Sequence, residues 1–133
     1  MPQLISQIKI TGLTLAVALF MISDAKSHWV ETGGQNSLAA NGLIHGIYHD
    51  FSGKIYAAGY FYNNTSKYYI AKWDGTTWSE LGGVNSLSAN QVLWLVTGDA
   101  NGNIYTAGNA TNNNGNKYVA KFDGTSWSEL SGI

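Results

Sequence analysis

The side chains that could carry out chemistry stand in two short patterns of this sequence. His45 and His49 are potential metal ligands, but four residues of extended chain hold them about 13 Å apart, too far to share an ion. Residues 99–103 (DANGN) match part of a calcium loop without its closing acid, and they equally suit a tight hairpin. No Ser/His/Asp set and no paired carboxylates cluster. We therefore expect no catalytic residue, no metal site and no cofactor.

Composition limits the classes of partner. The 133 residues suffice for one domain, and a hydrophobic content of 44% allows it a core. Only 11% of residues are charged, the net charge is -1, and all seven basic side chains are lysine. Nucleic acid is excluded as a partner because binding it requires a basic face. The absence of cysteine excludes disulfides, zinc knuckles and thiol nucleophiles.

Residues 1–25 form a segment with a different pattern from the rest. Residues 8–22 are almost entirely apolar, which is short for a membrane span but typical of the core of a secretory signal. Small residues at Ser23 and Ala25 predict cleavage after Ala25. The alternatives are an uncleaved anchor, which would be the protein's only membrane contact, or a strand or helix of the fold. An export signal predicts a secreted, extracellular or cell-surface protein.

An internal repeat organises residues 26–133. Trp29, Trp78 and Trp127 recur every 49 residues, so residues 29–77 and 78–126 are two copies and residues 127–133 begin a third. The copies align without a gap, and such a period is typical of solenoids and propellers.

Each repeat predicts four short strands joined by polar turns. Asp-Gly pairs and Asn-rich stretches mark the turns, and no segment after residue 28 has helical periodicity. We expect an all-β fold of two four-stranded antiparallel propeller-type blades, with an additional copy of the fourth strand at 28–32. The predicted strands are residues 43–48, 54–59, 68–73 and 77–81, and residues 92–97, 103–108, 117–122 and 126–130.

The repeat motifs resemble those of a known family. Residues 70–83 (IAKWDGTTWSELGG) and 102–108 (GNIYTAG) resemble repeats of bacterial secreted proteins that are grouped with kelch-like and galactose-oxidase-like β-propellers. The resemblance implies a propeller blade and no particular activity. A kelch blade has a double glycine after its second strand, whereas here Gly59 and Gly108 stand alone at that place. The copper chemistry of enzymes in this group uses a cysteine, which this chain lacks.

Two blades are too few to close a ring, because propellers have about four to eight. An isolated pair leaves an apolar face at each end, and such faces are interfaces. We therefore expect a non-enzymatic extracellular structural protein that self-assembles head to tail, as a filament or closed ring, through blade faces and a donated edge strand. Two alternatives remain open: a carbohydrate-binding, lectin-like module, and a fragment of a longer propeller.

Aromatic side chains are the candidates for the surface that binds a second copy or a glycan. Tyr60, Tyr62 and Tyr68 break the repeat, so the blade itself does not require them. The complete predicted set of assembly or ligand residues is Trp29, Tyr60, Tyr62, Tyr68, Trp94 and Trp127. Asn63, Asn64 and Asn109 each begin an N-x-[ST] sequence and are candidate glycosylation sites.

Overall fold

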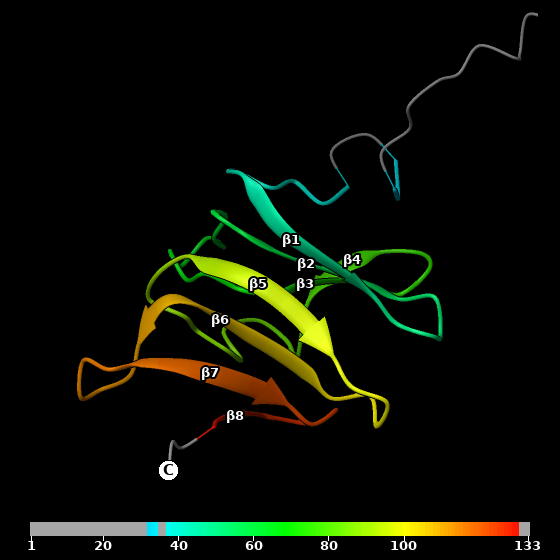
Figure 1. Ribbon diagram of the computed structural model, residues 1–133. Coiled ribbons are helices and arrows are strands. Elements are labelled where there is room, and N and C mark those ends of the chain that lie inside the picture. Colours follow the sequence, from blue (N-terminus) through cyan, green and yellow to red (C-terminus); the bar gives the residue numbers. More distant parts are fainter. Residues whose placement is uncertain (1–31, 35–36, 131–133) are drawn as a thin grey trace, which may run out of the picture. The chain divides into compact units, whose positions relative to one another are not determined.

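A computed structural model describes residues 32–34 and 37–130, and its regular structure there consists of eight β-strands (Figure 1). The strands are β1 (Ile44–His49), β2 (Ile55–Gly59), β3 (Ala71–Trp73), β4 (Trp78–Glu80), β5 (Leu93–Gly98), β6 (Ile104–Thr111), β7 (Lys117–Phe122) and β8 (Trp127–Glu129). This part of the chain contains no helix long and apolar enough to cross a membrane. The predicted export segment at 1–25, Trp29 and most of the predicted strand at 28–32 lie outside the described residues; Thr32, its last residue, is in a turn.

The strands form two separate four-stranded sheets, sheet 1 in the order β1-β2-β3-β4 and sheet 2 in the order β5-β6-β7-β8. Every neighbouring pair is antiparallel. The register repeats with the sequence, since Ile47 faces Ala57 in sheet 1 and Val96 faces Thr106 in sheet 2. The all-β prediction with two four-stranded antiparallel sheets is therefore confirmed.

In each sheet, a glycine of the second strand lies in close contact with the backbone just before the first strand. A Cβ atom at Gly59 would collide with the Leu43 carbonyl oxygen, and one at Gly108 with that of Val92. The first strand is bulged at the same place, between Ile44 and Gly46 in sheet 1. A single glycine in each repeat therefore meets a local steric requirement.

The strand boundaries differ from the prediction by more than one residue at two places. Strand β3 begins at Ala71 rather than residue 68, because the backbone of Tyr68 pairs with Ala89. Ala89 belongs to residues 82–92, which we call the linker between the sheets. Strand β6 continues to Thr111, because Thr111 pairs with Lys117 in sheet 2.

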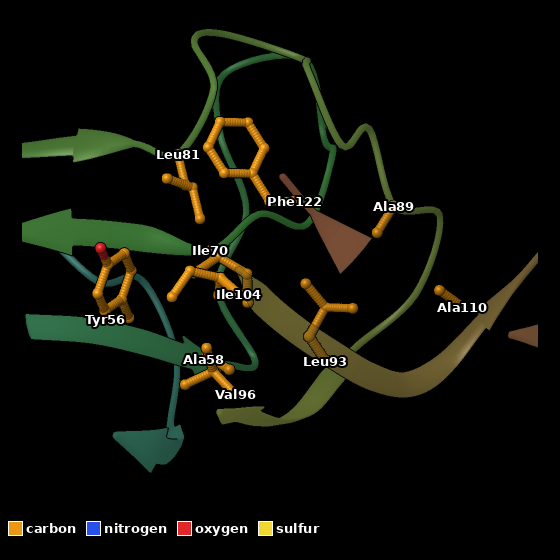
Figure 2. Close-up of a cluster of buried hydrophobic side chains, with 10 residues drawn as sticks. All are labelled: Tyr56, Ala58, Ile70, Leu81, Ala89, Leu93, Val96, Ile104, Ala110 and Phe122. Atoms are coloured by element: carbon orange, nitrogen blue, oxygen red, sulfur yellow. The ribbon is translucent and has the colours of Figure 1, made fainter. Parts of the chain in front are cut away.

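The main hydrophobic core lies between the two sheets (Figure 2). Strand β5 packs against β1 and β2. The core side chains are Tyr56, Ala58, Ile70 and Leu81 from sheet 1, Leu93, Val96, Ile104, Ala110 and Phe122 from sheet 2, and Ala89 from the linker. Because side chains alternate between the faces of a strand, opposite faces of the two repeats meet in this core: the sheet 1 face carrying Tyr56 and Ala58 is covered by the sheet 2 face carrying Ile104.

A smaller core lies on the other side of sheet 1. Ala57, Phe61 and Ala71 are buried there, with Leu38 and Ala40 packed against them. Residues 37–42 thus lie on sheet 1, as the linker between the sheets lies on sheet 2.

Candidate functional site

We call the side of sheet 1 that packs against sheet 2 its forward face. The equivalent side of sheet 2 is not covered by any described part of the chain. Ile70 is 1% exposed and Leu81 is 5% exposed in the core. The residues one repeat later, Val119 and Leu130, are 40% and 45% exposed. Tyr105 and Ala107 hold the positions of the buried Tyr56 and Ala58 and are half-buried. We call Tyr105, Ala107, Val119 and Leu130 the forward face of sheet 2.

In the first strand of each sheet the exposure is reversed: the residues of sheet 2 are buried and their counterparts in sheet 1 are exposed. Val96 in β5 is 7% exposed because it packs against sheet 1, whereas its counterpart Ile47 in β1 is 66% exposed. Leu93 is likewise buried and its counterpart Ile44 is exposed, with the exposed Leu43 beside it. We call Ile44 and Ile47 the rear face of sheet 1. The chain therefore exposes both halves of the interface that joins its own two sheets.

The linker between the sheets is bound to sheet 1 through polar contacts. Ala89 and Tyr68 exchange two backbone hydrogen bonds, at 2.9 and 3.1 Å. The Asn85 backbone N–H donates to Glu80 at 2.7 Å, and its side-chain oxygen accepts a bond from Asn63 Nδ2 at 2.9 Å. The linker therefore extends the edge of β3 beyond the end of β4.

Three of the six predicted surface aromatics meet in one cluster. The ring centroids of Tyr60 and Tyr62 each lie 5.8 Å from that of Tyr68, in edge-to-face contacts. Burial and a hydrogen bond with Tyr60 raise the pKa of Tyr68. Tyr60 and Tyr62 remain 49% and 42% exposed, so the cluster lies at the surface. At the equivalent place in sheet 2, Lys117 Nζ donates to Asn109 Oδ1 at 2.8 Å.

The two predicted tryptophans that the structure describes, Trp94 and Trp127, occupy different settings. Trp94 is 45% exposed on β5 and contacts the His45 ring. Trp127 is half-buried, and its indole N–H donates to the Leu81 carbonyl at 3.1 Å, which links sheet 2 to sheet 1. Trp78, one repeat earlier, makes the corresponding bond to the Thr32 carbonyl at 2.9 Å. Residue 32 thus takes the place that Leu81 takes one repeat later.

The three candidate glycosylation sites differ in how far their amides are engaged. Asn63 donates from Nδ2 to Glu80 and Asn85, and its Oδ1 accepts bonds from the turn that follows it. Asn109 is half-buried on β6 and bonded to Lys117. Asn64 is exposed in the turn. Its side chain is the most accessible acceptor of the three.

The aspartate turns bind their own backbone. Asp99 accepts bonds from the backbone N–H groups of Asn101 and Asn103, from Asn103 Nδ2 and from the Tyr105 hydroxyl, at 2.7–3.0 Å. These donors, the Asn103 side chain first, lower the pKa of Asp99 to about 2. Asp50 makes a similar turn, and burial together with the charge of Asp50 raises the pKa of Tyr56 to about 12. Among the described residues, no group of three or more His, Cys, Asp or Glu side chains could hold a metal ion.

A pocket beside the fourth strand occurs in both repeats. Its volume is about 240 Å³ at sheet 1 and about 320 Å³ at sheet 2. Equivalent residues line both: Ser37, Leu38, Asn63, Tyr69, Trp78 and Glu80 in the first, and Ser86, Leu87, Asn112, Tyr118, Trp127 and Glu129 in the second. Both glutamates accept a hydrogen bond from the equivalent asparagine, Glu80 from Asn63 and Glu129 from Asn112 at 2.8 Å. Glu80 accepts a further bond from the linker.

Two asparagines that clamp the fold were absent from the predicted set. Asn41 donates from Nδ2 to the Tyr62 carbonyl and accepts from the Tyr62 N–H, both at 3.0 Å. Asn90 makes the same pair of bonds with Thr111. The signal was present in the sequence, because both asparagines recur at the repeat spacing.

No family model matches this chain, and no curated protein and no solved structure matches it.

Proposed function

We propose that this protein is a non-enzymatic structural protein that assembles with copies of itself, head to tail, outside the cell or at its surface. The observation that carries the proposal is the pair of exposed faces. The forward face of sheet 2 has the side-chain positions that sheet 1 buries, and the rear face of sheet 1 has those that sheet 2 buries. The interface already present between the two sheets therefore supplies the pattern for a contact between copies.

The geometry of such a contact is heterologous, because two different surfaces meet. Repeated addition closes a ring or extends a filament. With propeller-type blades, a ring of two to four copies would contain four to eight blades, the usual range for that architecture. We also propose that the two sheets are kelch-like propeller blades.

The apolar part of the contact is modest. Ile44, Ile47, Val119 and Leu130 are already partly covered, and burying the remainder contributes about 1–2 kcal/mol each. Association costs about 4–15 kcal/mol in lost freedom of motion. Backbone pairing or a donated edge strand must therefore add to the apolar contact. Residues 28–32 repeat the Trp and Glu of β8, which makes them the candidate for the donated edge strand.

The molar mass of the purified chain, measured by light scattering over a wide concentration range, tests the proposal. We expect species larger than one chain, whose proportion rises with concentration, and electron microscopy then separates rings from filaments. A mass of 14.3 kDa at every concentration would contradict self-assembly.

Carbohydrate binding is a second candidate, which the repeated pocket favours. Each pocket places a tryptophan and a tyrosine beside amide, carboxylate and hydroxyl groups, a combination suited to the apolar faces and hydroxyl groups of a sugar. Saccharide titration followed by tryptophan fluorescence tests it. Saturable binding that Trp127→Ala abolishes and Trp94→Ala leaves intact supports this function, and no binding across a glycan panel removes it.

A further inference from the structure

A groove on the forward face of sheet 2 lies where sheet 1 holds the linker. Its volume is about 490 Å³, and its walls include Ala107, Lys117, Val119 and Leu130. The matching positions of sheet 1 are Ala58, Tyr68, Ile70 and Leu81, beside which the linker lies. The groove on sheet 2 is thus equivalent to the place on sheet 1 where the linker lies.

The edge of β7 is open for pairing at this groove. The N–H and C=O of Thr111 are both bonded to the Asn90 side chain, so Thr111 and Lys117 form the antiparallel pair without mutual hydrogen bonds. In such a pair the peptide groups of Lys117 point away from β6. Tyr68 has the same relation to Tyr62, and its peptide groups bind Ala89.

The chain contains a second segment with the sequence of the linker. Residues 37–42 (SLAANG) differ from residues 86–91 (SLSANQ) at two of six positions. On one side of this segment, Leu38 and Ala40 pack on sheet 1 and Asn41 is hydrogen-bonded to it. The linker contacts sheet 2 in the equivalent way. On the other side of residues 37–42, Ala40 makes no backbone hydrogen bond within the described residues, whereas its counterpart Ala89 makes two.

We propose that the groove on sheet 2 binds residues 37–42 of a second copy, with Ala40 of that copy paired to Lys117 as Ala89 is paired to Tyr68. The inference rests on the proposed self-assembly and identifies the segment that docks. The pairing extends the edge of β7, a form of strand addition in which backbone bonds give affinity and side-chain pockets give specificity.

Disulfide trapping in the full chain tests this pairing, because the protein has no cysteine of its own. Hydrogen-bonded antiparallel partners have Cα atoms about 5.5 Å apart, within the range that a disulfide spans. Ala40→Cys and Lys117→Cys are made as separate proteins and mixed under a glutathione redox buffer. Lys121→Cys replaces Lys117→Cys in the control, since it lies about 13 Å further along the same strand. Tyr68→Cys with Ala89→Cys in one chain reports that the geometry permits the bond.

We expect the Ala40→Cys and Lys117→Cys mixture to form a linked dimer at least ten times faster than the Lys121→Cys mixture. Equal or absent linking, in a protein that still assembles by light scattering, overturns the docking segment and leaves the proposed function standing. A chain that stays monomeric by light scattering and forms no linked dimer overturns both.

Discussion

The imidazole ring of His45 and the indole ring of Trp94 have their centroids 4.5 Å apart, at an interplanar angle of 52°. The two residues are counterparts in successive repeats. The first strands of the two sheets, β1 and β5, therefore lie side by side with equivalent residues next to each other. The strand register also repeats between the two sheets, and we propose that the relation between sheet 1 and sheet 2 is repeated between copies. A second copy placed in the same relation would bring its own His45 to Trp94 of the first, which is the physical basis of the proposed assembly.

Val119→Asp is expected to leave folding almost unchanged and to weaken assembly. Val119 is exposed on the forward face of sheet 2, and surface substitutions usually change stability by less than about 0.5 kcal/mol. The matched control is Ile70→Asp, which places a carboxylate at the buried counterpart and should prevent stable folding. Thermal melts of both variants check this. Equal melting temperatures for the two variants would mean that the two sheets do not pack as described.

Trp78→Ala is expected to destabilise the fold by about 3 kcal/mol, since the half-buried indole packs on the core that contains Ala71. Trp78→Phe retains most of that packing and loses the hydrogen bond to the Thr32 carbonyl, a loss of about 1 kcal/mol. Urea unfolding of the two variants separates packing from hydrogen bonding. An unchanged midpoint for Trp78→Ala would place this side chain outside the core.

Asp99→Asn is expected to destabilise the protein at pH 6 and to have little effect at pH 2. The folded pKa of Asp99 is about 2, below the ordinary value of 3.8, because the Asn103 side chain, Tyr105 and two backbone N–H groups donate to the carboxylate. A group with a lowered folded pKa stabilises the fold above its unfolded pKa, and this contribution is lost as the pH falls from about 4 to 2. Melting temperatures across this range check the sign. A difference between variant and wild type that grows on acidification would refute the assignment.

Asn63→Ala is expected to destabilise the protein by about 1–3 kcal/mol, because it removes the side chain that joins the turn to Glu80 and the linker. Asn64→Ala is the neighbouring control, and its exposed position predicts almost no change. Chemical unfolding of both checks the contrast. Equal effects would show that the Asn63 network contributes no stability.

Much of the fold follows from the repeat. Alternating apolar residues and turns that contain Asp and Gly suffice to place eight strands, because local contacts such as those of Asp50 and Asp99 close the hairpins. Periodicity could not predict that Tyr68 pairs with Ala89 as well as with Tyr62, since the contact with Ala89 depends on where the linker crosses. The position at which β3 begins therefore depends on a tertiary contact.

The candidate surfaces follow from the sequence only in part. The break in the repeat at Tyr60, Tyr62 and Tyr68 predicts a distinct surface, and the structure brings these three rings together. The exposed positions of Val119 and Ile47 could not be predicted from residue type, because their counterparts Ile70 and Val96 are equally apolar and buried. Exposure here depends on the number of neighbouring sheets, which periodicity within one repeat does not encode.

The most direct measurement of the central claim is the mass of a mixture of two face variants. Val119→Asp retains the rear face and Ile47→Asp retains the forward face. We expect each variant alone to be monomeric by sedimentation velocity, and an equimolar mixture to form a one-to-one dimer that grows no further, since each chain keeps only one working face. A mixture that sediments as two monomers, or variants that each assemble like the wild type, would contradict head-to-tail assembly through these faces.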